Sequence, residues 1–270
     1  MGSGMQVLTV ASTHINYGTL RETGYIPHCD YLEDSEPFLD WSKIHPDEVL
    51  EAHEREYDAW LDQAYPKPID ELHEACGRGC YISNNRPNPA TNTNQSYLGH
   101  IIEVDHLSVL GHGHVTLYVS GVSRALLLEL ERHQQRYSIN FSVLSQRYVN
   151  HGVDSDIEVV HPPIFDDLLN AELDDWFLNA QARYDTAYTR LREQGYSVKE
   201  SRGAARAFLP ENTETRFFVT GSIRAWRNII EQRLSPAADA EIREFARLVL
   251  AELEKIAPNS MQDVKIEGDK

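Results

Sequence analysis

ELERHQQRYSINFSVLSQRYV, residues 129–149, concentrates basic and hydrogen-bonding side chains in a chain whose formal net charge is −17. We expect the segment to begin as a helix and to end as a polar loop. Arg132, His133, Arg136 and Arg147 are suited to an anionic ligand, because a guanidinium can bind phosphate or carboxylate through two parallel hydrogen bonds. An ordinary solvated helix end would have the same composition, so charge alone does not establish a binding site.

Length and composition limit the class of protein. A chain of 270 residues that is 41% hydrophobic and 9% aromatic is typical of a globular protein, and we expect one domain over residues 1–270. No apolar run approaches the ~20 residues of a membrane span. No secretory signal is evident, and residues 1–4 look like a cloning remnant. The acidic balance argues against a nucleic-acid polymer as partner.

Three cysteines, Cys29, Cys76 and Cys80, have no metal-binding spacing, and their odd number favours a reducing, cytoplasmic location. His106, His112 and His114 raise the possibility of a zinc site. No cysteine or acidic ligand completes such a set, and HVTLYVS, residues 114–120, alternates as a strand does. Strand histidines that are bonded to the backbone are the simpler interpretation, and no metal is expected.

Hydrophobic periodicity predicts a mixed α/β protein. Strands are expected at residues 5–13, 114–120 and 215–220, and helices at 46–64, 70–76, 94–104, 121–136, 165–195, 222–233 and 236–256. We expect a surface extension at residues 14–45, a loop at 77–89 and a frayed tail at 258–270. Ser222 is a candidate helix cap, and so is either Thr91 or Thr93. The long helix near residue 180 is expected to place Trp176, Phe177, Tyr184 and Leu191 in the core.

Several blocks in the right order, over roughly residues 70–257, resemble the flavin-dependent thymidylate synthases. Arg132-His133 and Ser145-Gln146-Arg147-Tyr148 resemble that family's signature of Arg-His-Arg, seven residues and Ser-x-Arg-Tyr. Ser108–His112 and Ala205–Pro210 resemble its Ser-Val-Leu-Glu-His and Ala-Arg-x-x-Leu-Pro motifs. The chain departs at Gln134, which replaces an arginine, and at Gly111, which replaces a glutamate. Eleven residues separate His133 from Ser145, against eight in the family.

The resemblance implies a mixed sheet flanked by helices and a homotetramer whose active sites are shared between protomers. It also implies methylation of C5 of a uracil nucleotide. Methylenetetrahydrofolate would supply the carbon, and FAD, recharged by NADPH, would supply the reducing equivalents.

The resemblance also assigns residues to roles. Substrate binding falls to Arg124, Glu129, Leu144, Ser145, Arg147, Arg206 and Arg233. Cofactor binding falls to Cys80, His114, Arg132, His133, Gln134, Ser222, Arg224 and Asn228. The catalytic candidates are Arg233, Ser145 and His112. Arg233 is suited to stabilising charge on the ring, and Ser145 has no evident base partner, so it is interpreted as a phosphate or ribose ligand.

The departures gather around the expected sugar pocket, where Val143 also replaces a usual glutamate or glutamine. They favour a family variant that accepts UMP, similar to the UMP/dUMP C5-methylase of polyoxin (nucleoside antibiotic) biosynthesis. Ser138, Asn140 or Ser142 would then bind the extra 2′-hydroxyl. Two alternatives remain open: an ordinary thymidylate synthase that converts dUMP to dTMP, and a non-catalytic homologue that binds flavin or nucleotide.

Overall fold

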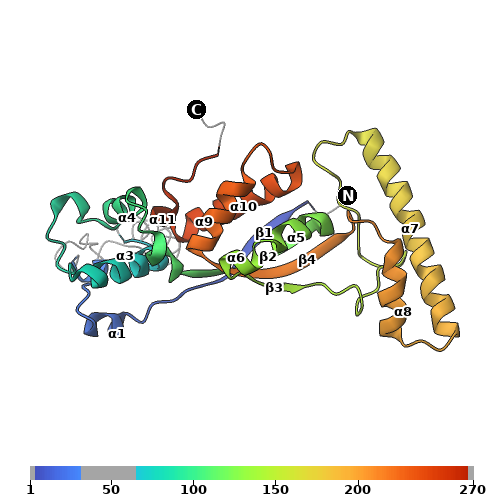
Figure 1. Ribbon diagram of the computed structural model, residues 1–270, viewed down its shortest axis with the longest axis horizontal. Coiled ribbons are helices and arrows are strands. Elements are labelled where there is room, and N and C mark those ends of the chain that lie inside the picture. Colours follow the sequence, from blue (N-terminus) through green and yellow to red (C-terminus); the bar gives the residue numbers. More distant parts are fainter. Residues whose placement is uncertain (1–3, 32–64, 267–270) are drawn as a thin grey trace, which may run out of the picture.

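A four-stranded antiparallel sheet in the order β1–β2–β4–β3 forms the centre of the molecule (Figure 1). The strands are β1 Gln6–Ser12, β2 His114–Ser123, β3 Asn140–Val143 and β4 Glu214–Ser222. This computed structural model describes residues 4–31 and 65–266. The predicted α/β class is confirmed, and so are the three strands that hydrophobic alternation predicted.

One face of the sheet is covered by three helices, α5 Arg124–Glu131, α9 Ile223–Arg233 and α10 Ala240–Ile256. Along β2, Val115, Leu117 and Val119 are fully buried, while the residues between them are half-buried. This alternation follows from the two-residue period of a strand. The buried side chains pack with Trp226 of α9 and Phe245 of α10 into the main hydrophobic core.

The opposite face of the sheet carries large apolar side chains that remain exposed. Leu8 and Val10 of β1 are 52% and 54% exposed, and Phe218 of β4 is 45% exposed. Tyr118 of β2 lies beside Phe218, with their ring centroids 5.0 Å apart. We call these four residues the open sheet face.

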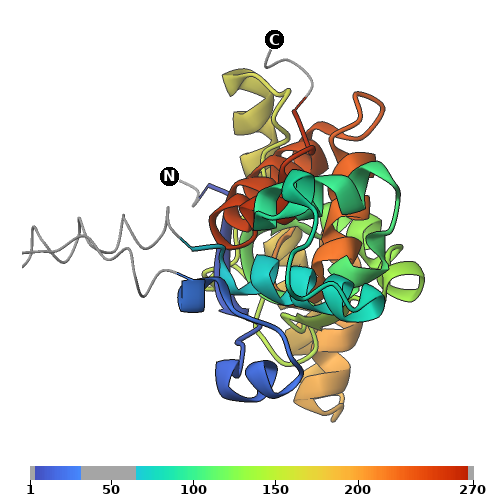
Figure 2. The ribbon, with the colours of Figure 1, turned by 90° about the vertical axis from the view of Figure 1, so that its left-hand side faces the viewer.

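Helices extend beyond both ends of the sheet (Figure 1). At one end lie α1 Tyr17–Glu22, α3 Pro68–Tyr81, α4 Asn94–Glu103 and α11 Pro258–Met261, with the 3-10 turns η1 His28–Tyr31, η3 Pro89–Thr91 and η4 Leu107–Gly111. Figure 2 views the molecule from this end, where α3, α4 and the C-terminal segment lie together. At the other end, α7 Asp167–Glu193 packs against α8 Val198–Ala205 and η5 Arg206–Phe208.

Two predicted helix caps are confirmed. Thr93 forms a capping box with Ser96 at the start of α4, and the Ser222 hydroxyl accepts from the amide of Ala225 at the start of α9. The predicted helix at residues 46–64 lies outside the described residues. In the part of the chain that the structure describes, no helix is long and apolar enough to cross a membrane.

The loop predicted at residues 77–89 is wrong at its start, because α3 continues to Tyr81. Gly77 lies inside this helix where a Cβ would be only 2.5 Å from the hydroxyl oxygen of Tyr97. The glycine therefore permits close packing of α3 against α4 and does not end the helix.

The helix predicted at 121–136 and the polar loop after it are also corrected. α5 ends at Glu131, and a short helix α6, Gln134–Tyr137, follows after a break at Arg132 and His133. Ser138 then adopts a left-handed conformation with φ 55°, and residues 140–143 form β3 against β4. The insertion relative to the family signature is thus regular structure, not a loop.

Three further expectations are wrong in part. Residues 258–266 are not a frayed tail, because α11 places Ser260 and Met261 in the interior. The extension at 14–45 contains helix α1 and the buried side chain of Tyr25 within its described part. Phe177 and Tyr184 are core residues as predicted, Leu191 is half-buried, and Trp176 is 54% exposed.

Candidate active site

Helix α9 presents polar side chains on two sides of a buried stripe. Trp226 and Ile230 face the core, while Arg224 and Asn228, one turn apart, lie together on one flank. Asn228 donates its side-chain amide to the carbonyl of Arg224 at 2.7 Å. Arg233 lies on the other flank, as its nine-residue separation from Arg224 predicts at 3.6 residues per turn.

Arg233 is held by the end of α5. Its Nε donates to Nε2 of His133 at 3.0 Å, its Nη1 donates to Oε2 of Glu129 at 3.0 Å, and its Nη2 donates to the carbonyl of Glu129 at 2.9 Å. Tyr137 stacks on the His133 ring at a centroid distance of 5.6 Å and accepts a hydrogen bond from Gln232. We call these five residues the Arg233 cluster. It joins the first half of the signature to the end of α9.

The cluster requires a neutral imidazole. His133 accepts the guanidinium N–H at Nε2, so this nitrogen carries no proton. Burial lowers the pKa of His133 to about 4, with further lowering by Arg233, Arg132 and Arg136. Glu129 experiences the opposite balance, since burial and Asp239 raise its pKa.

The second half of the signature packs against α8. The backbone amide of Arg147 donates to the Ser145 hydroxyl at 3.3 Å, and the Tyr148 carbonyl accepts from Nη1 of Arg202. The Lys199 ammonium lies 4.9 Å from the centre of the Tyr148 ring. The Arg147 side chain passes Gly203, where a Cβ would be 3.8 Å away.

Two more arginines lie in this region: Arg206 directly follows α8, and Arg124 is close enough to His151 to act on it, as Arg202 is. Arg124 and Arg206 lie near enough for their like charges to interact, and burial together with Arg206 lowers the pKa of Arg124. Within residues 4–31 and 65–266, Arg124, Arg147 and Arg206 have no carboxylate within 4.0 Å. We call the group the α8 cation cluster, and its members are Arg124, Arg147, Lys199, Arg202 and Arg206. Like charges gathered without counter-ions are suited to an anion.

A cavity of about 610 Å³ lies between α9, the turn before η4 and the C-terminal segment. Arg224 and Asn228 line one wall, and Asp263 and Lys265 line another. Arg227 closes the base through hydrogen bonds of 2.7 and 2.8 Å to the Asp263 carboxylate. We call this space the α9 cavity.

The loop from Gly111 to His114 lies beside the Arg224 guanidinium, which would be 3.9 Å from a Cβ at Gly111. His112 and His114 are both exposed, and Nδ1 of His114 faces the His112 carbonyl at 3.3 Å. Among the described residues no group of three His, Cys, Asp or Glu side chains is placed to hold a metal ion.

The structure thus brings together many of the residues that the sequence selected, but not all. The Arg233 cluster unites Glu129, His133 and Arg233. In the α8 cation cluster, Arg147 adjoins Ser145, and Arg124 lies near Arg206. Arg132 and Gln134 are exposed beside the first cluster, and Leu144 bonds through its amide to the carbonyl of Arg216. Cys80 is exposed at the far end of α3, and no described contact joins it to either cluster.

Sequence reasoning missed Lys199 and Arg202. They share one side of α8 with Arg206, because the three residues follow one another at spacings of three and four. That spacing was visible in the sequence, but nothing in it showed that α8 packs on the signature segment.

The structure is that of an α/β protein with arginine-rich clusters whose chemistry is suited to anionic ligands. A family model described as "Thymidylate synthase complementing protein" matches residues 60–259. The probable flavin-dependent thymidylate synthase of Mycobacterium phage L5 is 38% identical over 267 residues, which cover 96% of this chain and 97% of that protein. The flavin-dependent thymidylate synthase of Mycolicibacterium gilvum (strain PYR-GCK) is 44% identical over 206 residues, 72% of this chain and 79% of that one.

The chain belongs to the flavin-dependent thymidylate synthase family, as its signature segments indicated. The fold agrees with a solved relative, thymidylate synthase X from Helicobacter pylori, described with FAD and dUMP. That chain is 21% identical and gives a TM-score of 0.50 over 74% of this chain and 93% of its own length.

Proposed function

We propose that the protein converts dUMP to dTMP as a flavin-dependent thymidylate synthase. A carbon–carbon bond forms between C5 of the uracil ring and the methylene carbon of methylenetetrahydrofolate. Both methylene–nitrogen bonds break, which leaves tetrahydrofolate, C5 loses its proton, and a hydride whose two electrons originate from NADPH reduces the new substituent to a methyl group. The relatives at 38% and 44% identity, each named as such a synthase, support this reaction.

The observation on which the proposal depends is the orientation of Arg233. A guanidinium has five N–H donors, and three of them are used by His133 and Glu129. The remaining two are fixed in direction and free to bind a carbonyl oxygen of the pyrimidine. Negative charge that develops on the ring when C5 attacks is stabilised by such a preorganised donor.

The α8 cation cluster supplies the site for the 5′-phosphate. Arg147 and Arg206 have no carboxylate partner among the described residues and can each bind two phosphate oxygens. Ser145 adds a hydroxyl beside Arg147. Its neighbour in the hydrogen-bond network is a backbone amide and not a base, so Ser145 binds substrate and is not a nucleophile.

The α9 cavity fits part of a flavin cofactor. Its wall provides the Arg224 guanidinium and the Asn228 side chain, a cation and a hydrogen-bonding amide suited to a diphosphate. Ser222 lies at the start of the same helix. His133 belongs to the Arg233 cluster, and Arg132 and Gln134 are exposed beside that cluster. FAD, when bound, supplies the reducing equivalents for the methyl group.

The exposed apolar side chains of the sheet support an assembly of several copies. We infer a homotetramer in which the open sheet face is covered by another copy. Exposed apolar side chains on a sheet are costly in water, and Leu8, Val10, Tyr118 and Phe218 form such a surface.

UMP is a less well supported substrate than dUMP. The relatives described above are named thymidylate synthases, which favours the deoxynucleotide. Asn140 and Ser142 are exposed on β3 and alternate with Phe141 and Val143, which pack on the core. Their side chains therefore point to the face opposite α9, away from Arg233 of the same protomer.

Release of tritium from C5 tests the proposal. Labelled dUMP and UMP are incubated in parallel with the protein, FAD, NADPH and methylenetetrahydrofolate. We expect release from dUMP to be faster and dTMP to accumulate. Faster release from UMP would instead support a ribonucleotide methylase. If the protein binds flavin but releases tritium from neither nucleotide, the proposed enzymatic activity is refuted.

A further inference from the structure

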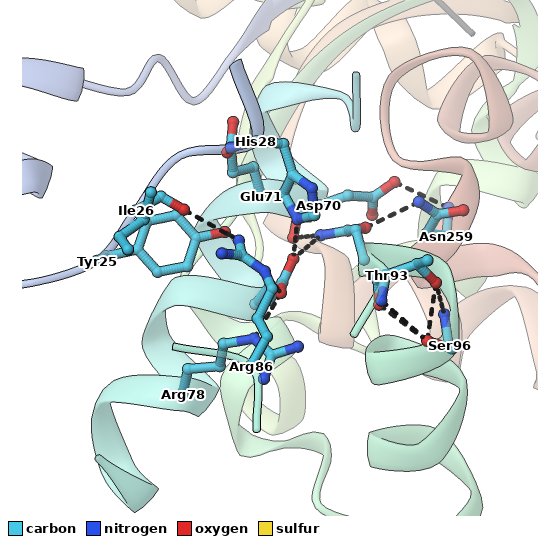
Figure 3. Close-up of polar contacts among 12 residues, drawn as sticks. Tyr25, Ile26, His28, Asp70, Glu71, Arg78, Arg86, Thr93, Ser96 and Asn259 are labelled. Carbon is cyan, nitrogen blue, oxygen red and sulfur yellow. Dashed lines mark hydrogen bonds and ion pairs between the residues drawn. The ribbon is translucent and has the colours of Figure 1, made fainter. Parts of the chain in front are cut away.

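Helix α3 is joined to the C-terminal turn by a buried chain of hydrogen bonds. Nδ1 of His73 lies 2.8 Å from the Ser260 hydroxyl oxygen, and that hydroxyl donates to the Asp70 carboxylate. The carboxylate also accepts from the amides of Asn259 at 2.8 Å and Ser260 at 2.9 Å. Asp70, His73 and Ser260 are all fully buried, and Figure 3 shows Asp70 facing Asn259.

The direction of the protons in this chain is determined at its far end. The backbone amide of Gly113 donates to Nε2 of His73 at 3.1 Å, so Nε2 carries no proton. A neutral ring must then be protonated at Nδ1, and Nδ1 donates to Ser260, which donates to Asp70. Burial, together with the nearby His112 and His114, lowers the pKa of His73 to about 3, which keeps the ring neutral.

These hydrogen bonds end in the loop beside Arg224, a residue that lines the α9 cavity. Gly113 separates His112 from His114, and its carbonyl accepts from the amide of Ile223 at 2.9 Å, in the first turn of α9. A Cβ at Gly113 would lie 2.7 Å from Nε2 of His73. The backbone therefore approaches the imidazole as closely as a glycine allows, and the position of the ring determines the position of the loop.

The same three residue types form the triad of serine hydrolases, but the order here is different. In a hydrolase the histidine lies between the serine and the aspartate and removes the serine proton. Here Ser260 lies between His73 and Asp70, and its hydroxyl is inaccessible to solvent. The hydrogen bonds among Asp70, Ser260 and His73 therefore do not activate a nucleophile, and they have a different role.

We propose that Asp70, Ser260 and His73 are positioning residues for the flavin site, acting through Gly113 on the loop of His112 and His114 and on the start of α9. The C-terminal turn thereby becomes part of the cofactor site. Ser260 contributes a second time, since its carbonyl accepts from Arg227 at 2.6 Å beneath the α9 cavity. This inference rests on the proposed use of flavin.

A purely structural role for α11 is separated from positioning by a matched pair of variants. Ser260→Ala removes the hydroxyl that orients His73. Asn259→Ala removes a neighbouring side-chain hydrogen bond, from Asn259 to Asn94 at 2.8 Å, but leaves every member of the chain in place. We expect both variants to weaken the packing of α11. Only Ser260→Ala should also leave the loop of His112 and His114 without its support from His73.

FAD affinity is the first readout, measured by quenching of flavin fluorescence with no substrate present. We expect Ser260→Ala to bind FAD about tenfold more weakly, the effect of one buried hydrogen bond to the loop. Asn259→Ala should remain within about twofold of the unchanged protein at an equal loss of thermal stability. Equal weakening in both variants, or none in Ser260→Ala, would overturn the positioning role.

The tautomer of His73 is the second readout. It is measured on the unchanged protein, so it does not depend on the folding of a variant. Nitrogen NMR of protein labelled at histidine distinguishes Nδ1–H, Nε2–H and imidazolium rings. We expect neutral His73 with the proton on Nδ1 near pH 7, and an Nε2–H ring or an imidazolium would overturn the inference. Failure of the unchanged protein to bind FAD would refute the proposed function instead, whatever the tautomer.

Discussion

The Nε of Arg233 donates to Nε2 of His133 at 3.0 Å, across the junction between α9 and the break that follows α5. The bond fixes the plane of the guanidinium, and Glu129 fixes its rotation through two further bonds. Planarity and a forked set of donors distinguish arginine from lysine in this position. The geometry therefore predicts that catalytic activity is lost when lysine replaces Arg233, because lysine keeps the positive charge but lacks the planar, forked set of N–H donors.

Arg233→Lys is expected to lower kcat on the order of 10²-fold with little change in melting temperature, because a preorganised donor to the ring is lost. Steady-state rates with dUMP and a thermal melt provide the measurement. Arg247→Lys is the control, since Arg247 pairs with Glu244 on an exposed helix surface. A kcat within a few-fold of the unchanged enzyme would contradict the role of Arg233.

Three buried histidines, His73, His133 and His151, make the fold sensitive to acid, because burial lowers the pKa of each. The pKa is lowered to about 3 for His73 and to about 4 for His133, by burial and neighbouring positive charge, whereas an unfolded histidine titrates near 6.5. The unfolded state then binds protons that the folded state does not, so the free energy of unfolding decreases as pH falls below 6.5. Each histidine contributes about 1.4 kcal/mol per pH unit.

Asp70 opposes this trend. Burial raises its pKa to about 6, so below that pH the folded state holds a proton that the unfolded state releases until about pH 4. We expect the free energy of unfolding measured in urea to fall between pH 6 and 5, but less steeply than the buried histidines alone would cause. His133→Asn, which keeps an acceptor for Arg233, should remove about one proton from the slope. An unchanged slope would show that His133 is protonated in the fold.

Glu74 lies at the centre of a buried ion network. Figure 3 shows its partners His28, Arg78 and Arg86. Its carboxylate accepts from Nε of Arg78 at 2.5 Å, Nε of Arg86 at 3.2 Å, and the side chain of Asn94 at 2.9 Å, and it lies 2.7 Å from Nε2 of His28. Glu74→Gln would remove the buried counter-charge of the Arg78 guanidinium. We expect a loss of about 3–5 kcal/mol in the free energy of unfolding.

Chemical unfolding measures this loss, and Glu244→Gln is the matched control. Glu244 pairs with Arg247 at 3.2 Å, but both side chains are more than 40% exposed. An exposed pair contributes about 0–1 kcal/mol, so the two substitutions should differ several-fold. Similar losses from both would show that water reaches the Glu74 network.

The sequence predictions were accurate where structure depends on neighbouring residues, and less accurate where it depends on contacts between distant segments. Helix α9 was predicted with its cap, because Ser222 and the apolar spacing of Trp226 and Ile230 are local signals. The two-sided arrangement of Arg224 and Arg233 followed from helical geometry alone. Family signatures then selected Glu129 and His133, but only the fold showed that they orient Arg233.

Errors arose where distant segments determine local structure. β3 has four residues with two polar side chains, and it is extended because β4 supplies its hydrogen bonds. The C-terminal residues 258–266 are polar in sequence, yet Asp70 binds their backbone amides from far along the chain. Trp176 was placed in the core on hydrophobicity, although its flank of α7 has no described covering segment.

Arg147 is expected to bind the phosphate of the substrate and not the base. Arg147→Gln should weaken dUMP binding about 10- to 100-fold, the usual range for a hydrogen bond to a charged group. Affinity for 2′-deoxyuridine, which lacks the phosphate, should not change. Calorimetric titration with both ligands separates the two effects, with Arg183→Gln on the exposed side of α7 as control. An equal loss of affinity for dUMP and 2′-deoxyuridine would show that Arg147 does not bind the phosphate.

The open sheet face is expected to be covered in the assembled enzyme. Phe218 is 45% exposed and its ring lies 5.0 Å from that of Tyr118, so Phe218→Lys introduces a charge at the centre of the apolar surface. Burying that ammonium against another copy is unfavourable, and light scattering should show a fall in mass from tetramer towards protomer. Leu178→Lys, at an equally exposed position of α7, should leave the mass unchanged.

Activity should fall together with the mass of the assembly. If sites are shared, each protomer of Phe218→Lys retains the Arg233 cluster and the α8 cation cluster but lacks the groups that a neighbouring copy contributes. Tritium release from dUMP should then decrease by at least the fraction that has dissociated, and higher protein concentration should restore both by mass action. Dissociated protomers with full activity would show that one chain forms a complete site.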